Sequence, residues 1–182
     1  MKPAPFDYLR ATSLDDALEA LRQHGPEARI IAGGQSLMPM LNMRFVLPDH
    51  VIDLNQVDVL SGVREHGGTI EIGAMTRQRE IEFSDLVRKK CPLMHEAIGN
   101  VGHRQTRNRG TIGGSIAHLD PGAELPVIAA ALHAEIEIAN QSGTRKVAFS
   151  DFAQGYLTNC LEADEIVTAI RWPIASPSSG AA

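Results

Sequence analysis

Two glycine doublets constrain this chain more than any other feature of its sequence. The first lies in the run Ala32-Gly33-Gly34-Gln35-Ser36-Leu37, and the second lies in the run Gly110-Thr111-Ile112-Gly113-Gly114-Ser115. Glycine allows tight turns and close approach of the backbone, and unpaired N–H groups can bind phosphate oxygens. Because the doublets lie about 80 residues apart, we expect two segments that hold one elongated, phosphate-containing ligand between two subdomains.

The residues beside each doublet favour ligand contact. Gln35 and Ser36 add side-chain donors after the first doublet, and Ser36 stands where a helix is expected to start. Thr111 and Ser115 place hydroxyls on either side of the second doublet, which we expect to form a loop. The alternative for each doublet is a plain turn or bulge that needs glycine for its backbone angles.

Other familiar sites are absent from the sequence. Neither doublet belongs to a G-x-G-x-x-G fingerprint or a G-x-x-x-x-G-K-[ST] loop, which disfavours a Rossmann dehydrogenase and a P-loop ATPase. The cationic run Arg104–Arg109 predicts either a solvated face or a phosphate contact. For His118 and Asp120 an acid/base role is open, but a turn-stabilising role before Pro121 is favoured. We therefore expect no catalytic residue on this chain.

Charge and cysteine content narrow the class of protein. A formal net charge of -5 disfavours a nucleic-acid partner. No apolar run approaches the roughly 20 residues of a membrane helix, and the N-terminal residues do not resemble a secretion signal, so we expect a cytoplasmic protein. The only cysteines, Cys91 and Cys160, cannot hold an iron–sulfur cluster or a four-thiolate zinc site. We expect no metal site here.

Residue patterns predict an α+β protein of two lobes. In residues 1–56, Ser13 caps a helix that stops at Gly25, and two strands flank a short helix over 36–44, which gives a small α/β lobe. In residues 57–174, alternating apolar residues predict a larger mixed-sheet lobe with helices. Its expected strands are 60–64, 69–73, 135–139, 145–149 and 165–172, and its expected helices are one capped by Thr76 and containing Ile81 and Phe83, 92–101 and 121–132.

Several runs together resemble a known family. Residues 32–40, 72–76, 107–117 and 118–122 are similar in order and spacing to the FAD-binding, or medium, subunit of molybdenum hydroxylases. This family includes aerobic carbon monoxide dehydrogenase and multi-subunit xanthine dehydrogenases. The resemblance implies a two-lobed FAD-binding fold of the vanillyl-alcohol-oxidase/PCMH type, in which the diphosphate of FAD lies against both glycine segments.

The resemblance also implies which residues bind FAD. Leu37 should pack near the cofactor, Glu124 takes the place of an acidic flavin contact, and Val167 matches an apolar backbone contact in the last strand. Ser115 is often Asn or Asp in relatives, so amide contacts are expected to matter more there than its side chain. The implied cofactor-binding residues are Ala32, Gly33, Gly34, Gln35, Ser36, Leu37, Thr111, Ile112, Gly113, Gly114, Ser115, Glu124 and Val167.

The implied function is electron transfer within a larger oxidoreductase that is not active as this chain alone. A large subunit would carry the molybdenum cofactor, and a small subunit would carry [2Fe–2S] clusters. Electrons would pass through FAD to NAD⁺, oxygen or another acceptor, in a dimer of heterotrimers. Residues 175–182 would be a linker toward a C-terminal domain absent from this sequence. The alternatives are a self-contained flavin oxidoreductase of the same fold and a non-catalytic flavin-binding or assembly module.

Overall fold

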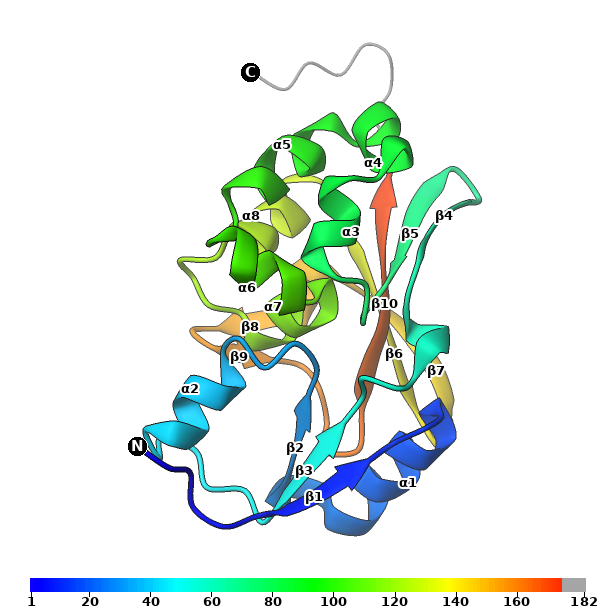
Figure 1. The fold of residues 1–182 in the computed structure, drawn as a ribbon. Helices are drawn as coiled ribbons and strands as arrows, with labels where there is room; N and C mark the ends of the chain where they lie inside the picture. Colours follow the sequence, from blue (N-terminus) through cyan, green and yellow to red (C-terminus); the bar gives the residue numbers. More distant parts are fainter. Residues whose placement is uncertain (175–182) are drawn as a thin grey trace.

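The structure, a computed structural model, describes residues 1–174 of the 182-residue chain. The expected linker, 175–182, lies outside the described residues. Figure 1 shows a small sheet with two helices at one end of the molecule and a longer sheet covered by helices at the other. Within residues 1–174, no helix has the length and hydropathy needed to cross a membrane.

The small sheet is parallel. Its strands are β1 (Asp7–Arg10), β2 (Ala28–Ile31) and β3 (His50–Asp53), in the order β1-β3-β2. Helix α1 (Leu14–His24) connects β1 to the 3₁₀ turn η1 (Gly25–Glu27), and α2 (Leu37–Asn42) follows the first glycine doublet. The predicted helices and the strands β2 and β3 are confirmed, whereas β1 was not anticipated.

Helix α1 begins as its sequence predicts. The Ser13 hydroxyl accepts a hydrogen bond from the Asp16 amide at 3.0 Å, and an Asp16 carboxylate oxygen accepts one from the Ser13 amide at 3.1 Å. This capping box satisfies N–H groups that have no partner inside the helix. The buried face of α1 carries Ala17, Leu18 and Leu21, at the spacing that directs an apolar stripe toward a sheet.

The larger sheet has five strands in the order β4-β5-β10-β6-β7. Every pairing in it is antiparallel, so the expectation of a mixed sheet is corrected. For β4–β5 and β6–β7 the cause is local, because tight turns join these strands and tight turns connect only antiparallel neighbours. The strands are β4 (Val63–His66), β5 (Thr69–Gly73), β6 (Glu135–Asn140), β7 (Gly143–Ala148) and β10 (Ile166–Pro173).

Helices cover one face of this sheet (Figure 1). Alternate residues of the central strands turn inward, and the fully buried ones include Ile72, Ile136 and Trp172. Helices and short elements that complete this part are η2 (Asp58–Leu60), α3 (Gln78–Glu82), α4 (Asp85–Lys90), α5 (Pro92–Asn100), α6 (Arg104–Arg109), α7 (Ile112–His118), α8 (Glu124–Ala131), α9 (Phe149–Phe152), β8 (Ala153–Gly155) and β9 (Thr158–Asn159).

The structure corrects several predicted elements. Thr76 does not cap α3. Its hydroxyl instead donates a hydrogen bond to the Gly62 carbonyl and accepts one from the Gly62 amide. Phe83 follows α3 rather than lying within it, and α8 starts at Glu124 rather than at Pro121. The segment after Thr111 forms helix α7, although its two glycines led us to expect a loop. The helices α4 and α6 and the pair β8–β9 were not anticipated.

The two parts share a core. Val57, Met75 and Ile166 pack in the same buried cluster as residues of α1 and the small sheet. The small sheet therefore buries its apolar side partly against segments that come later in the chain. The boundary between residues 56 and 57 stays a prediction.

Candidate functional site

A cavity of about 920 Å³ lies where the two parts meet. This volume is near the upper end of the range of small-molecule sites, about 300–1,000 Å³. Both glycine segments line the cavity, Gly33 and Gly34 from the first and Gly113 and Gly114 from the second. The arrangement fits an elongated ligand that contacts both segments.

The first glycine segment presents free backbone donors. The N–H groups of residues 33–36 have no hydrogen-bond acceptor among the described residues, and all four residues line the cavity. Gly34 has φ 73°, a backbone conformation that favours glycine. The Ser36 hydroxyl makes no capping bond to α2, although Ser36 stands at its N-cap. This wall has the chemistry of an anion-binding nest.

The second segment differs, because its backbone donors are already used. The amide of Ile112 donates to the Thr76 carbonyl at 3.1 Å, and that of Gly113 donates to the Ala74 carbonyl at 2.9 Å. The amide of Gly114 donates to the Thr111 hydroxyl at 3.2 Å, which caps α7. The expectation of bare backbone amides is therefore wrong for Ile112, Gly113 and Gly114, and the polar side chains of this wall are the hydroxyls of Thr111 and Ser115.

The two glycine segments approach each other closely. A Cβ atom added to Gly33 would lie 2.3 Å from the Arg109 carbonyl oxygen and 2.8 Å from the Gly110 Cα. Such distances are too short for real Cβ contacts, so only glycine fits at position 33 with this backbone. One glycine of the first doublet thus serves the packing of the two walls.

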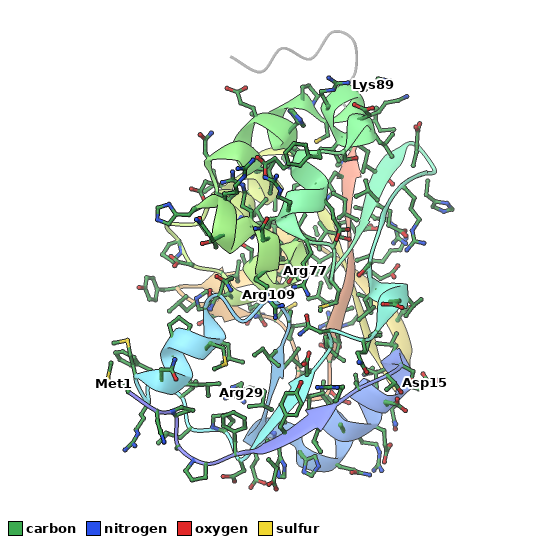
Figure 2. All side chains as sticks on the ribbon, viewed as in Figure 1. Met1, Asp15, Arg29, Arg77, Lys89 and Arg109 are labelled. Atoms are coloured by element: carbon green, nitrogen blue, oxygen red, sulfur yellow. The ribbon has the colours of Figure 1, made fainter. Side chains whose placement is uncertain are left out.

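Arg77 connects the two walls through its guanidinium. It donates hydrogen bonds to the Asn55 side-chain oxygen and to the Arg109 carbonyl, and Asn55 in turn donates to the Ala32 carbonyl at 3.0 Å. Figure 2 shows Arg77 and Arg109 at neighbouring positions near the middle of the molecule. Burial, followed by the Arg109 charge, lowers the pKa of Arg77. The bonds join the residue just after β2 to the last residue of α6.

Most of the predicted cofactor-binding residues line this one cavity, although they come from distant parts of the chain. Ile112 and Glu124 do not line it. Ile112 is fully buried in the core of the larger part, and Glu124 lies in the first turn of α8, next to the lining residue Ala123. The contacts of these residues with a cofactor stay predictions. Those that line the cavity are Ala32, Gly33, Gly34, Gln35, Ser36, Leu37, Thr111, Gly113, Gly114, Ser115 and Val167.

Sequence reasoning missed several lining residues. Gln78 begins α3, two residues after the recognised run that ends at Thr76, and Asn159 belongs to β9. Glu165 also lines the cavity and pairs with Arg145 at 2.7 Å. The hydrogen bond from Arg145 lowers the pKa of the Glu165 carboxyl. Of these three lining residues, only Gln78 could have been suspected from the sequence, because it lies next to the run that ends at Thr76.

Of the remaining polar candidates, Asp120 and Arg107 have structural roles, whereas His118 lines the cavity. Asp120 lines the cavity, and its side chain accepts a hydrogen bond from the Gly122 amide at 2.9 Å, which confirms the turn-stabilising role. Within the run Arg104–Arg109, Arg107 is buried and pairs with Glu82 at 3.0 Å. Neither Arg104 nor Arg109, the first and last residues of this run, lines the cavity. Among residues 1–174, no three His, Cys, Asp or Glu side chains are grouped to hold a metal ion.

The fold and the cavity define a class of protein, an α+β domain with a large cavity lined by a nest of free amides and a hydroxyl-bearing helix start. Residues 4–175 match the family described as the FAD binding domain in molybdopterin dehydrogenase. This chain belongs to that family. The family and cofactor expected from the sequence are confirmed.

Relatives and solved structures agree with this assignment. The chain is 42% identical to the glyceraldehyde dehydrogenase medium chain of Sulfolobus acidocaldarius, covering 96% of this chain and 62% of that one. It is 40% identical to caffeine dehydrogenase subunit beta of a Pseudomonas species, covering 99% and 61%. A carbon monoxide dehydrogenase structure from Hydrogenophaga pseudoflava superposes with a TM-score of 0.95 at 40% identity, covering 97% and 62%. The chain therefore spans less than two thirds of the length of these proteins.

Proposed function

We propose that this chain is the FAD-binding electron-transfer subunit of a molybdenum-containing hydroxylase or dehydrogenase. The observation that carries the proposal is the set of free amides of residues 33–36 on the wall of a large cavity, in a chain of the FAD-binding family. A fully ionised diphosphate offers only acceptor oxygens, so it complements a row of N–H donors. The proposed cofactor-binding residues are those implied by the resemblance, including Ile112 and Glu124.

The residues of the chain bind and orient the cofactor. The amides after Ala32 would hold the diphosphate, and the hydroxyls of Thr111 and Ser115 on the neighbouring segment would also bond it. Leu37 and Val167 would supply apolar contacts. When bound, FAD supplies the two-electron and one-electron redox chemistry that no side chain of this chain offers. The protein would contribute the position and the electrostatic environment of the cofactor.

The partners proposed are a large subunit with the molybdenum cofactor and a small subunit with [2Fe–2S] clusters. The names of the relatives support this, because "medium chain" and "subunit beta" describe parts of larger enzymes. Electrons would leave the clusters and reach NAD⁺, oxygen or another acceptor by way of FAD, in a dimer of heterotrimers. The cytoplasmic location expected from the sequence stays a prediction.

A titration with FAD tests the cofactor proposal. The purified protein should bind FAD at one site per chain, with quenching or shifting of flavin fluorescence and absorbance bands that remain after gel filtration. ADP should compete, because it carries the same diphosphate. Absence of FAD uptake by folded protein would overturn the proposal.

The partner proposal needs a separate experiment. When the tagged protein is purified from its natural host, two further polypeptides should co-purify with it, and the complex should contain molybdenum and iron. Recovery of the chain as an isolated flavoprotein that oxidises an organic substrate would favour the self-contained oxidoreductase instead.

A further inference from the structure

Gln78 is a buried polar residue on the cavity wall whose side-chain oxygen has no partner. It is the first residue of α3, it is 5% exposed, and it lines the cavity. Its Oε1 atom accepts no hydrogen bond from any described residue. Among residues 1–174, three other buried side-chain atoms lack a hydrogen-bond partner, in His50, Arg171 and Trp172, and none of these residues lines the cavity. An orphaned buried acceptor is costly unless a ligand or water satisfies it.

The surroundings hold the Gln78 carboxamide beside both glycine segments. Its own amide donates to the Gly110 carbonyl at 2.9 Å, which fixes the start of α3. A Cβ added to Gly110 would lie 2.7 Å from Gln78 Oε1, so the absence of a side chain at position 110 leaves the space that the carboxamide uses. Gly110 also adjoins the first segment, since a Cβ added to Gly33 would lie 2.8 Å from the Gly110 Cα. The oxygen therefore lies close to the wall that carries the free amides.

The chemistry of this oxygen limits what it can bind. A carboxamide oxygen only accepts hydrogen bonds, and an ionised diphosphate also offers only acceptors. The two cannot bond each other directly, so the partner of Oε1 is a donor next to the diphosphate. In a flavin dinucleotide the groups that flank the diphosphate are polyols, the ribityl chain on one side and ribose on the other.

We propose that Gln78 is a cofactor-binding residue whose Oε1 accepts a hydrogen bond from a polyol hydroxyl adjoining the diphosphate. This inference rests on the proposed binding of FAD. It assigns a binding role to α3, which comes between the two glycine segments in the chain. The buried oxygen is kept without an internal partner because the ligand supplies one.

The substitution Gln78→Met tests this role, because methionine has nearly the same length and volume but no carbonyl. We expect the Kd for FAD to rise about three- to tenfold, as for the loss of one neutral hydrogen bond. The melting temperature of the FAD-free protein should stay equal or rise, because an unpaired buried oxygen has been removed. Gln105→Met is the matched control, since Gln105 lies on exposed α6 surface and does not line the cavity. It should change neither quantity.

Titrations with FMN and ADP identify the hydroxyl. FMN contains the ribityl chain without ribose, and ADP contains ribose without the ribityl chain. A weaker affinity of Gln78→Met for FMN assigns the ribityl chain, and a weaker affinity for ADP assigns ribose, so both support the inference. Loss of FAD affinity without either effect would overturn it, as would an unchanged Kd for FAD or a lower melting temperature. If the unmodified protein binds no FAD, it is the proposed function that fails.

Discussion

At the scale of single residues, glycine in this protein mainly allows close packing between walls of the cavity. Gly33 lies against the Arg109 carbonyl, and Gly113 lies against Ala74, where an added Cβ would be 2.5 Å from the Ala74 side chain. Both positions border the cavity, yet the contact that requires glycine is with protein backbone or side chain. The doublets therefore allow the two segments to pack closely, and they also leave backbone accessible to a ligand.

We predict that Gly33→Ala destabilises the protein and weakens FAD binding. The new Cβ, 2.3 Å from the Arg109 carbonyl oxygen, would force the two glycine segments apart. Overpacking of this kind costs about 1–3 kcal/mol, which urea unfolding of the FAD-free protein would measure.

The matched control is Gly99→Ala. Gly99 lies in α5, and no atom lies within 4 Å of an added Cβ. It should raise the free energy of unfolding by about 0.5–1 kcal/mol, because alanine favours a helix over glycine. Equal stability of the two variants would contradict the packing role of Gly33.

At the scale of elements, the polar side chain before a helix decides where several helices begin. Ser13, Ser84 and Thr111 each accept a hydrogen bond from an amide in the first turn of the helix that follows. Ser36 stands at the same position before α2 but makes no such bond. Its hydroxyl is therefore left for another partner, and it lines the cavity.

We predict that Ser13→Ala changes the stability of the protein, whereas Ser36→Ala changes its affinity for FAD. Ser13→Ala should lower the free energy of unfolding by about 1 kcal/mol, since it removes a capping bond. Ser36→Ala should leave the stability of the FAD-free protein unchanged and raise the Kd for FAD. Unfolding curves and FAD titrations of both variants check this, and a stability loss in Ser36→Ala would show that its hydroxyl serves the helix.

At the scale of the whole molecule, a few polar contacts join segments that are far apart in the chain. The Arg77 guanidinium connects Asn55 to the Arg109 carbonyl. Arg145 and Glu165 join β7 to the segment just before β10. Both sets lie next to the cavity, so they hold its walls in place before a ligand arrives.

We predict that Arg77→Met lowers the free energy of unfolding by about 1.5–3 kcal/mol, the range for hydrogen bonds that involve a charged group. It should also weaken FAD binding, because the two walls would no longer be held at a fixed separation. Arg88→Met is the control, since Arg88 makes an exposed pair with Asp85 at 2.6 Å, and exposed pairs contribute little. Unchanged FAD affinity in Arg77→Met would show that Arg77 does not contribute to FAD binding.

Acid stability should depend on Glu165. Its folded-state pKa lies below the usual 4.5, because Arg145 donates to the carboxylate. A lowered pKa stabilises the fold above the pKa of the unfolded chain, and this contribution is lost as the pH falls through the folded-state pKa. Glu165→Gln should therefore be less stable than the unmodified protein at pH 6, and the difference should shrink below about pH 4.

Unfolding curves at several pH values measure this effect. Glu96→Gln is the control, because Glu96 is exposed on α5 and makes no ion pair among the described residues. A constant difference between Glu165→Gln and the unmodified protein from pH 6 to pH 3 would contradict the assignment.

The sequence by itself determined the local signals of this protein. The capping box at Ser13 and the alternation of Glu135–Asn140 depend on near neighbours, so they identified α1 and β6. The runs around both glycine doublets also identified the family, because their residue types and order are properties of the chain alone.

Only the tertiary structure decided how those signals are used. Thr76 bonds Gly62, which lies earlier in the chain, and the amides of α7 bond Ala74 and Thr76 instead of remaining free. The orphaned oxygen of Gln78 is recognisable only when its burial and the cavity are known. The physical reason is that hydrogen bonding and burial depend on which distant segments meet, and local residue patterns do not contain that information.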